Sequence, residues 1–140
     1  MSKNLIDQLT LHEGSKRFVY KDTTGHWTIG VGRNISEGGM GLSEEEISFL
    51  LKNDIRRVDQ ELDKAFKFYA GLDPVRRDAL INICFNVGLP RLKGFKRALR
   101  SLEVSDYEDS ALEFLDSLWA DQVGKRAEDI AHMIRAGEYP

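Results

Sequence analysis

Two carboxylates near the amino end are the residues of this chain best suited to paired acid and base chemistry. Glu13 follows a stretch of helical periodicity, and Asp22 stands nine positions later in the turn Asp22-Thr23-Thr24-Gly25. A chain reversal between them would aim both acids into one cleft. Hydrolysis of a glycosidic bond needs such a pair, one carboxyl group to protonate the leaving oxygen and a second to steer the nucleophile. The chain holds 23 acidic residues, so the spacing alone also fits a surface glutamate and a turn aspartate.

Other kinds of catalytic site find little support in the sequence. His12, His26 and His132 occur singly, without the spacing of metal ligands, so we expect neither a metal nor another cofactor. Cys84 is the single cysteine and lies in the apolar run from Leu80 to Phe85. We therefore predict a buried thiol that packs as a small apolar residue, and no disulfide within the chain. The sequence contains no nucleophile elbow, phosphate loop or dinucleotide-binding glycine pattern.

Composition is that of an ordinary globular protein. The 140 residues fit one compact unit or two small lobes, with 41% hydrophobic and 31% charged residues. A net charge of -3 gives no field that would hold a nucleic acid. No apolar run approaches the roughly 20 residues of a membrane span, and the first residues lack the apolar core of a secretory signal. We expect a monomer without stable membrane insertion. One basic cluster fits either a solvated helix face or contact with an anionic wall polymer: Arg91, Lys93, Lys96, Arg97 and Arg100.

The elements that position the two acids begin with a helix. Leu5, Ile6 and Leu9 recur at helical spacing, with a possible N-cap at Ser2 or Asn4 and a stop at Gly14. The period then changes to two over residues 18–31, which predicts a β-hairpin around the turn that contains Asp22. The glycine-rich stretch that follows, up to residue 42, predicts a small sheet region with loops.

The rest of the chain has helical periodicity. Ser43 and Glu46 form a capping box before an apolar stripe that predicts one helix over residues 43–69, roughly 40 Å long at 1.5 Å per residue. Asp73-Pro74 begins the next helix and Gly88 ends it. Three shorter helices are expected over residues 93–102, 106–119 and 124–136, the middle one capped by Ser105 with Glu108 and the last closed by Gly137.

These elements predict an α+β fold that is predominantly helical. We expect a single domain over residues 1–140, built from two lobes. Residues 14–42 would form the small β-containing lobe, and residues 43–69 the connecting helix. Residues 1–13 and 70–140 would form the helical lobe. A site between two lobes joined by one helix would open and close by hinge bending.

Two ordered blocks of the sequence carry a family resemblance. The first contains Leu11-His12-Glu13-Gly14, then Tyr20-Lys21-Asp22-Thr23, then Trp27-Thr28-Ile29-Gly30-Val31-Gly32, and it resembles the active-site segment of T4-type phage lysozymes. The second, residues 77–88 followed by Gly94-Phe95, resembles the central helix of that family's C-terminal lobe. The resemblance covers most of the chain and implies a lysozyme-like, two-lobed fold with a small β-hairpin lobe.

The resemblance also implies catalytic roles. Trp119 followed by Arg126 is similar to the family's C-terminal signature, and Arg126 matches an arginine that pairs with the catalytic glutamate. Glu13 matches the general acid. Asp22 and Thr28 match the pair that holds the attacking water, so that the reaction inverts at the anomeric carbon. The carboxyl groups of an inverting site stand roughly 6.5 to 9.5 Å apart, and we expect that separation here.

Further site residues are implied in the same way. Phe85 aligns with a residue of the saccharide groove, although core packing is an equally good use of a phenylalanine on this helix. An ion pair between Arg33 and Asp54 is implied between the small lobe and the connecting helix. Between residues 34 and 43 a short loop stands where longer relatives insert a helix, so we expect a reduced small lobe. Three positions contact substrate in relatives but hold different residue types here: Asn34, Ala98 and Glu113.

The implied activity is that of a muramidase, a peptidoglycan hydrolase of the glycoside hydrolase class. It would cut the β-1,4 bond between N-acetylmuramic acid and N-acetylglucosamine in glycan strands, without a cofactor. An endolysin of this kind would accumulate in the host cytoplasm and reach the wall at lysis through a lesion made by a separate protein. A lytic transglycosylase acting on the same bond is one alternative, although it would not need Asp22 and Thr28. A non-catalytic wall-binding phage module is another, which would leave all three site residues unexplained.

Overall fold

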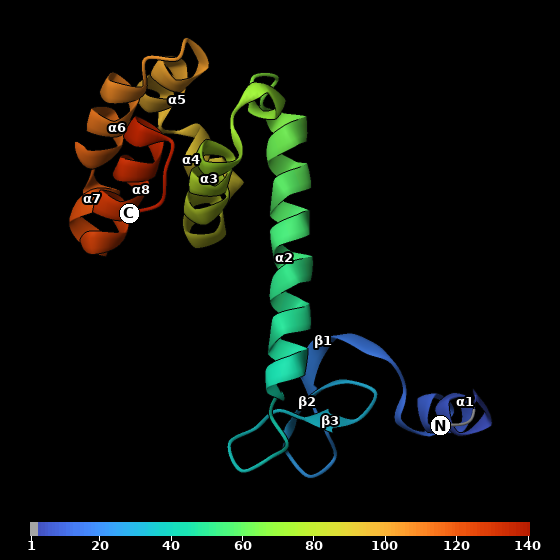
Figure 1. The fold of residues 1–140 in the computed structure, drawn as a ribbon. Coiled ribbons are helices and arrows are strands. Elements are labelled where there is room, and N and C mark those ends of the chain that lie inside the picture. Colours follow the sequence, from blue (N-terminus) through green and yellow to red (C-terminus); the bar gives the residue numbers. More distant parts are fainter. Residues whose placement is uncertain (1–2) are drawn as a thin grey trace. The chain divides into compact units, whose positions relative to one another are not determined.

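The computed structural model describes residues 3–140, so the possible N-cap Ser2 lies outside the described residues. The chain divides into two compact units, a first unit of residues 1–50 and a second unit of residues 51–140. Each unit is described by itself, with its elements labelled as in Figure 1. Short strands occur in the first unit and helices make up most of the chain, so the prediction of a predominantly helical α+β fold is confirmed. The grouping of residues 1–13 with residues 70–140 stays a prediction.

Helix α1 (Lys3–Glu13) begins the first unit and ends where the sequence predicts. Gly14 is left-handed, with φ of 77°, and its amide donates to the carbonyl of Thr10 at 2.9 Å. Glycine adopts this conformation without the steric cost that a side chain brings, so it ends the helix cleanly. None of the side chains of α1 is buried. The last residue of the helix, Glu13, thus lies shortly before β1, the first strand of the sheet.

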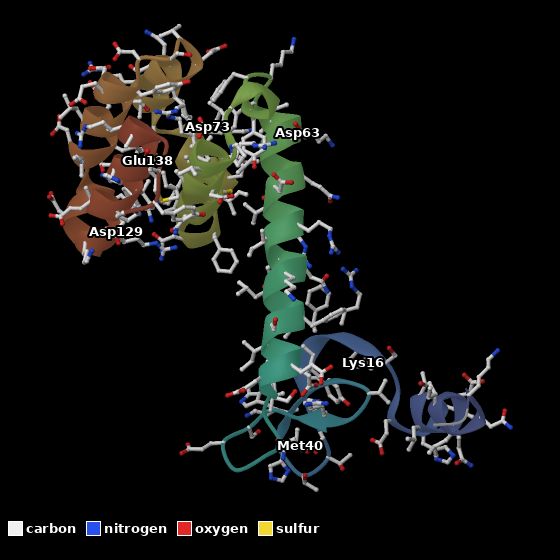
Figure 2. All side chains as sticks on the ribbon, in the orientation of Figure 1. Lys16, Met40, Asp63, Asp73, Asp129 and Glu138 are labelled. Atoms are coloured by element: carbon white, nitrogen blue, oxygen red, sulfur yellow. The ribbon has the colours of Figure 1, made fainter. Side chains whose placement is uncertain are left out.

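The sheet of the first unit has three antiparallel strands in the order β1 (Lys16–Lys21), β2 (Trp27–Gly30) and β3 (Arg33–Asn34). In Figure 2, Lys16 marks the start of β1. The register places Thr28 opposite Tyr20 on one side and Asn34 on the other. Thr28 is therefore in the central strand, and it is only 3% exposed. The predicted hairpin is confirmed, and β3 extends it to a third strand.

Helix α2 (Glu44–Ala65) begins at the predicted capping box. The Ser43 hydroxyl accepts from the Glu46 amide at 3.1 Å, and the Glu46 carboxylate accepts from the Ser43 amide at 2.9 Å. Two amides that the first turn of a helix leaves without partners are thereby bonded. Residues 35–43, between β3 and α2, form turns and contain no helix, as the shortened loop predicts. Met40, labelled in Figure 2, lies in this loop.

The end of α2 differs from the prediction. The helix stops at Ala65 rather than residue 69, and the chain tightens into the 3₁₀ helix η1 (Tyr69–Gly71). In this segment the Gly71 amide donates to the carbonyl of Phe68 and the Leu72 amide to that of Tyr69, each three residues back, at 3.1 Å. Both kinds of helix bury every third or fourth residue, so the apolar spacing that continues to Tyr69 does not distinguish them.

The second unit contains the end of α2 and then a series of helices. Helix α3 begins as predicted, with the Asp73 carboxylate accepting from the Arg76 amide, and Gly88 ends it with φ of 82°. Helix α8 packs against α3, α6 and α7, and α5 packs against α6 (Figure 1). The bounds of the helices are α3 (Pro74–Val87), α4 (Leu89–Lys93), α5 (Lys96–Glu103), α6 (Tyr107–Leu115), α7 (Leu118–Val123) and α8 (Lys125–Ala136).

Three helix boundaries in this unit correct the prediction. The segment 106–119 holds two helices, because Ser117 leaves the helical conformation and its hydroxyl accepts from the Ala120 amide at 3.1 Å to cap α7. The cap of α6 is Asp106, which accepts from the Asp109 amide, and not Ser105, which has a positive φ of 63°. The helix predicted over residues 93–102 begins only at Lys96, as α5, because residues 89–93 form the separate short helix α4. Gly137 closes α8 in the left-handed conformation, as predicted.

The hydrophobic core belongs to the second unit. It extends from Leu62 on α2 to Ile134 on α8, and its largest buried side chains are Trp119, Tyr69 and Phe114. Cys84 lies in this cluster, and burial raises the pKa of its thiol, as expected for a packing role. Among residues 3–140, no helix is both long and apolar enough to cross a membrane.

Candidate active site

Glu13 lies against the turn that joins β2 to β3. A Cβ atom built on Gly32 would stand 2.8 Å from Oε2 and 3.0 Å from Cδ of the Glu13 side chain. Both distances are shorter than ordinary contacts, so a side chain at residue 32 would force the Glu13 carboxyl group to shift. Gly32 also has a φ of 69°, which favours glycine independently. Helix α1 and the sheet thus meet through the carboxyl group of Glu13.

Asp22 lies at the opposite end of β2, in the turn of the hairpin. Its amide donates to the carbonyl of His26 at 2.9 Å, and its own carbonyl accepts from the Gly25 amide at 3.0 Å, with Gly25 at φ of 84°. The side chain folds back into the same turn, where Oδ1 accepts three hydrogen bonds from Thr24 and His26. These donors hold the pKa of Asp22 below its usual range: the His26 amide has the largest effect and the Thr24 hydroxyl the next. Asp22 is therefore held as a carboxylate.

Thr28 is joined to Asp22 through one shared acceptor. The Thr28 hydroxyl donates to the carbonyl of His26 at 3.0 Å, and this is the same carbonyl that accepts from the Asp22 amide. Asp22 and Thr28, the two residues predicted to hold the water, are therefore both hydrogen-bonded to the carbonyl of His26. Because a hydroxyl carries a single hydrogen, the Thr28 oxygen retains only acceptor capacity for a further partner.

The three predicted catalytic residues thus lie along one strand of the first unit. Asp22 precedes β2, Thr28 is within it, and Glu13 packs against Gly32 just beyond it. The strand has four residues, which at roughly 3.3 Å each span about 10 to 13 Å between the two turns. The separation of 6.5 to 9.5 Å between the carboxyl groups stays a prediction.

Phe85 and Arg126 lie in the second unit, where they line the same cavity of about 340 Å³. Phe85 is 47% exposed and stands outside the hydrophobic core, which leaves its ring available for contact. The Arg126 guanidinium donates from Nε to the side-chain oxygen of Asn82 at 2.9 Å and from Nη2 to its carbonyl at 3.1 Å. Asn82 is thus the partner of Arg126 within this unit. The predicted pairing of Arg126 with Glu13 stays a prediction.

Ala98 and Glu113 come together on a second cavity of the same unit. Ala98 is on α5 and Glu113 on α6, and both line a hollow of about 570 Å³ beside Trp119. The cavity has a mixed charge, because Arg97 and Lys96 line it together with Glu113. A cavity of this size and polarity can hold a small polar ligand. Contact of these residues with substrate stays a prediction.

Asn34 has a structural role in the first unit. Its side-chain oxygen accepts from the Ser36 amide at 2.9 Å, and its carbonyl accepts from the Met40 amide at 3.1 Å. The loop packs closely on it, since a Cβ atom on Gly39 would stand 2.7 Å from the Asn34 carbonyl oxygen. Asn34 therefore closes the loop after β3. Its predicted contact with substrate would have to use the amide nitrogen.

The structure gives Arg33 a partner within the first unit, and its predicted ion pair with Asp54 of the second unit stays a prediction. Arg33 forms a bidentate pair with Glu46, with Nη2 to Oε2 at 2.7 Å and Nη1 to Oε1 at 2.8 Å, and it also donates to the carbonyl of Gly41. Asp54 lies in the second unit, where its carboxylate pairs with Arg57 at 3.8 Å. The capping box places Glu46 beside the loop that leads from Arg33, which brings the two side chains together.

Three residues that the sequence analysis did not assign take part in this geometry. Gly32 receives the Glu13 carboxyl group, and Thr24 and His26 bind the Asp22 side chain. The turn Asp22-Thr23-Thr24-Gly25 was a visible signal for the last two, because aspartate side chains often bond to amides two residues on. Nothing in the local sequence connects Gly32 with Glu13, which is nineteen positions earlier in the chain.

Comparison with known proteins places these features in a family. The family model described as phage lysozyme matches residues 10–135. Probable T4-type lysozyme 2 of Dictyostelium discoideum is 27% identical, over 98% of this chain and 96% of that protein. The Endolysin of Salmonella phage P22 is 33% identical, over 85% of this chain and 82% of that protein. The Pre-baseplate central spike protein Gp5 of Enterobacteria phage T4 is 24% identical, over 96% of this chain and 28% of that protein.

Proposed function

The chain belongs to the phage lysozyme family of glycoside hydrolases, and from that premise we propose that it is a muramidase. The bond cut is the β-1,4 linkage between N-acetylmuramic acid and N-acetylglucosamine in peptidoglycan. One observation carries the proposal: Asp22 and Thr28 bind the same carbonyl at one end of β2, and the Glu13 carboxyl group packs against the turn at the other end. An acid and a pair of water acceptors on one short strand are the parts that hydrolysis of a glycoside needs.

Glu13 is the general acid of the proposed reaction. As the bond between the anomeric carbon and the glycosidic oxygen breaks, its electron pair leaves with that oxygen, which takes the proton of Glu13. In the structure the carboxyl group lies beside Gly32, at the end of β2 opposite to Asp22. Such positioning matters because proton transfer requires a donor within about 3 Å of the oxygen.

The attacking water is held by two acceptors. The Thr28 hydroxyl donates its hydrogen to the His26 carbonyl, and Oδ1 of Asp22 already accepts three hydrogen bonds. Thr28 Oγ1 and Asp22 Oδ2 are left to accept, so a water that donates one hydrogen to each turns a lone pair toward the sugar. The water oxygen forms the new bond to the anomeric carbon, and the proton it loses passes to the Asp22 carboxylate. The lowered pKa of Asp22 ensures that this carboxylate is ionised beforehand.

We propose that the reaction inverts, because Asp22 and Thr28 are placed to hold a water that attacks the anomeric carbon from the face opposite the leaving oxygen. A retaining site needs its carboxyl groups only about 5 Å apart, so that one of them can attack directly. We propose host-cell lysis as the biological setting, given the kinship with the P22 Endolysin.

A turbidity assay on purified peptidoglycan tests the proposal. The wild-type chain should clear the suspension, and Glu13→Gln should lower the rate by about a hundredfold or more, since it removes the acid. Glu37→Gln is the matched control, because Glu37 is an exposed glutamate of the same unit and should leave the rate unchanged. Equal clearing by wild type and Glu13→Gln would remove Glu13 from its role.

Product analysis separates the proposed hydrolysis from the alternatives. Mass spectrometry should give reducing-end products, whereas a lytic transglycosylase would yield anhydro products lighter by one water. Proton NMR of fresh products should show the α-anomer that inversion of a β-linkage creates. Binding to peptidoglycan without any clearing would instead favour a wall-binding module, a reading that the match to part of a phage spike protein keeps relevant.

A further inference from the structure

The side chain of Asp22 is bonded on one oxygen only. Oδ1 accepts from the Thr24 amide at 2.9 Å, from the Thr24 hydroxyl at 2.8 Å and from the His26 amide at 2.9 Å. No group among residues 3–140 donates to Oδ2. Three donors on a single oxygen set both the rotamer of the side chain and the oxygen that remains free.

The Thr24 hydroxyl also contacts the imidazole of His26, and this contact fixes the direction of the hydrogen bonds. Thr24 Oγ1 stands 2.6 Å from Nδ1 of His26 and 2.8 Å from Oδ1 of Asp22. A carboxylate can only accept, so the one hydrogen of the hydroxyl points to Asp22. His26 Nδ1 must then be the donor to Thr24. The chain of bonds leads from the imidazole through the hydroxyl to the carboxylate, and it requires a hydrogen on Nδ1.

His26 reaches the water-holding residues through its backbone as well. Its amide donates to the Asp22 side chain, and its carbonyl accepts from both the Asp22 amide and the Thr28 hydroxyl. Both protein groups proposed to hold the water therefore depend on the placement of this one residue. Its imidazole, hydrogen-bonded to Thr24, restrains that placement from the side-chain end.

We infer that Thr24 and His26 are positioning residues for the hydrolytic reaction, because together they hold Asp22 so that Oδ2 faces the attacking water. The inference rests on the proposed function and deepens it. Neither side chain touches substrate in this arrangement; each acts through Asp22, and His26 also acts through Thr28. The imidazole works in the form that carries hydrogen on Nδ1, and a neutral ring with its hydrogen on Nε2 would break the chain of bonds.

Variants at residue 24 test the hydroxyl. Thr24→Val keeps the shape but removes the donor, and we expect kcat to fall about ten- to a hundredfold with KM little changed, since a small misplacement of the water is costly. Thr24→Ser restores a hydroxyl and should restore kcat. Thr23→Val is the matched control, because Thr23 is exposed in the same turn and has no hydrogen bond among the described residues. A kcat for Thr24→Val equal to that of Thr23→Val would overturn the inference.

Variants at residue 26 test the imidazole in the same way. Asparagine offers a side-chain N–H at about the position of Nδ1, so His26→Asn should keep most of the kcat, whereas His26→Phe has no donor and should lose it. The backbone bonds of residue 26 are present in both, so the difference reports the side chain alone. Equal kcat values for the two variants, with unchanged unfolding midpoints, would remove the imidazole from the proposed role.

Two NMR measurements test the hydrogen bonds without reference to activity. In ¹⁵N-labelled protein, the neutral His26 ring should carry its hydrogen on Nδ1, and Thr24→Val should release it to the Nε2 form. A ¹³C titration of the Asp22 carboxyl group should give a pKa below the ordinary aspartate value, and Thr24→Val should raise it. An Nε2–H ring in the wild type would contradict the chain of bonds. If wild type fails to clear peptidoglycan, the proposed function fails while these measurements still decide whether the chain of bonds exists.

Discussion

The two units of this molecule are stabilised by different interactions. The second unit has a continuous apolar core from Leu62 to Ile134, whereas Thr28 is the one buried residue among residues 3–50. The first unit is instead ordered by polar contacts: the Asp22 turn, the capping box at Ser43 and the Arg33–Glu46 pair. It also has an open, mainly apolar pocket of about 880 Å³ between the sheet and the start of α2.

The apolar core that stabilises the fold and the residues proposed for catalysis therefore belong to different units. A close-packed apolar core contributes most of the free energy of folding, while polar turns contribute little net energy but set directions accurately. Glu13, Asp22 and Thr28 are all in the unit without such a core. Elements with few buried apolar contacts open more readily than a packed core, and functional sites are often found in them.

The comparison predicts the largest effect for a matched pair of phenylalanine truncations. Phe114 is fully buried in the second unit and Phe18 is 76% exposed on β1. Phe114→Ala should lower the free energy of unfolding by about 3 to 5 kcal/mol, and Phe18→Ala by less than about 0.5 kcal/mol. Urea unfolding followed by circular dichroism measures both. Similar losses for the two variants would show that the first unit has a core of comparable strength.

A matched pair of glycine substitutions separates backbone strain from the Glu13 contact. Gly30 and Gly32 have φ of 66° and 69°, but a Cβ on Gly30 meets nothing within 4 Å whereas one on Gly32 meets the Glu13 carboxyl group. Both alanine variants should be strained by about 1 kcal/mol or somewhat more. Gly32→Ala should in addition lower the rate of peptidoglycan clearing about a hundredfold, because it displaces the acid. Equal rates for the two variants would argue against the contact.

Two arginines extend the comparison to polar contacts. Arg76 donates to the carbonyls of Ile134 and Arg135, pairs with Asp73, and stacks on Tyr107 with its side chain 13% exposed. Arg76→Met should lower the free energy of unfolding by about 2 kcal/mol, since it leaves partly buried acceptors unpaired.

Arg33 is the counterpart in the first unit, with a side chain that is 31% exposed. Arg33→Met should cost no more than about 1 kcal/mol, as solvent screens its pair with Glu46. Thermal unfolding of the two variants under one buffer condition gives the comparison. A larger loss for Arg33→Met than for Arg76→Met would reverse the expected order of the two units.

The smallest effect expected is one of pH on the start of α2. The pKa of Glu46 lies below its ordinary value. The hydrogen bond from the Ser43 amide has the largest lowering effect, the Ser43 hydroxyl has the next, and Arg33 has a smaller one. A carboxyl group whose pKa is lower in the folded state stabilises the fold at pH values above its unfolded-state pKa. This stabilisation is lost as the pH falls through the folded-state pKa. The protection factors of the amides of Glu46 and Ile47, which correct for the slower intrinsic exchange at low pH, should therefore fall at acid pH. Glu46→Gln should remove this dependence, and unchanged protection of the wild type at acid pH would contradict the assignment.

Local signals in the sequence predicted many of the boundaries. Gly14, the Ser43–Glu46 capping box, Asp73-Pro74 and Gly137 each end or begin a helix where expected. Each signal depends on bonds within a few residues, so neighbouring residues suffice to specify it. The end of α2 and the break at Ser117 were missed because apolar periodicity continues across both.

The sequence by itself determined the family, the types of the residues proposed for catalysis and their order along the chain. Only the tertiary structure decided which groups meet: Arg33 with Glu46, Glu13 with Gly32, and Thr28 with the carbonyl that also binds Asp22. The physical reason is one of range. Caps and turns are set by bonds within a few residues, whereas partners far apart in the chain are selected by the register of strands and by how near competing groups stand once the backbone has folded.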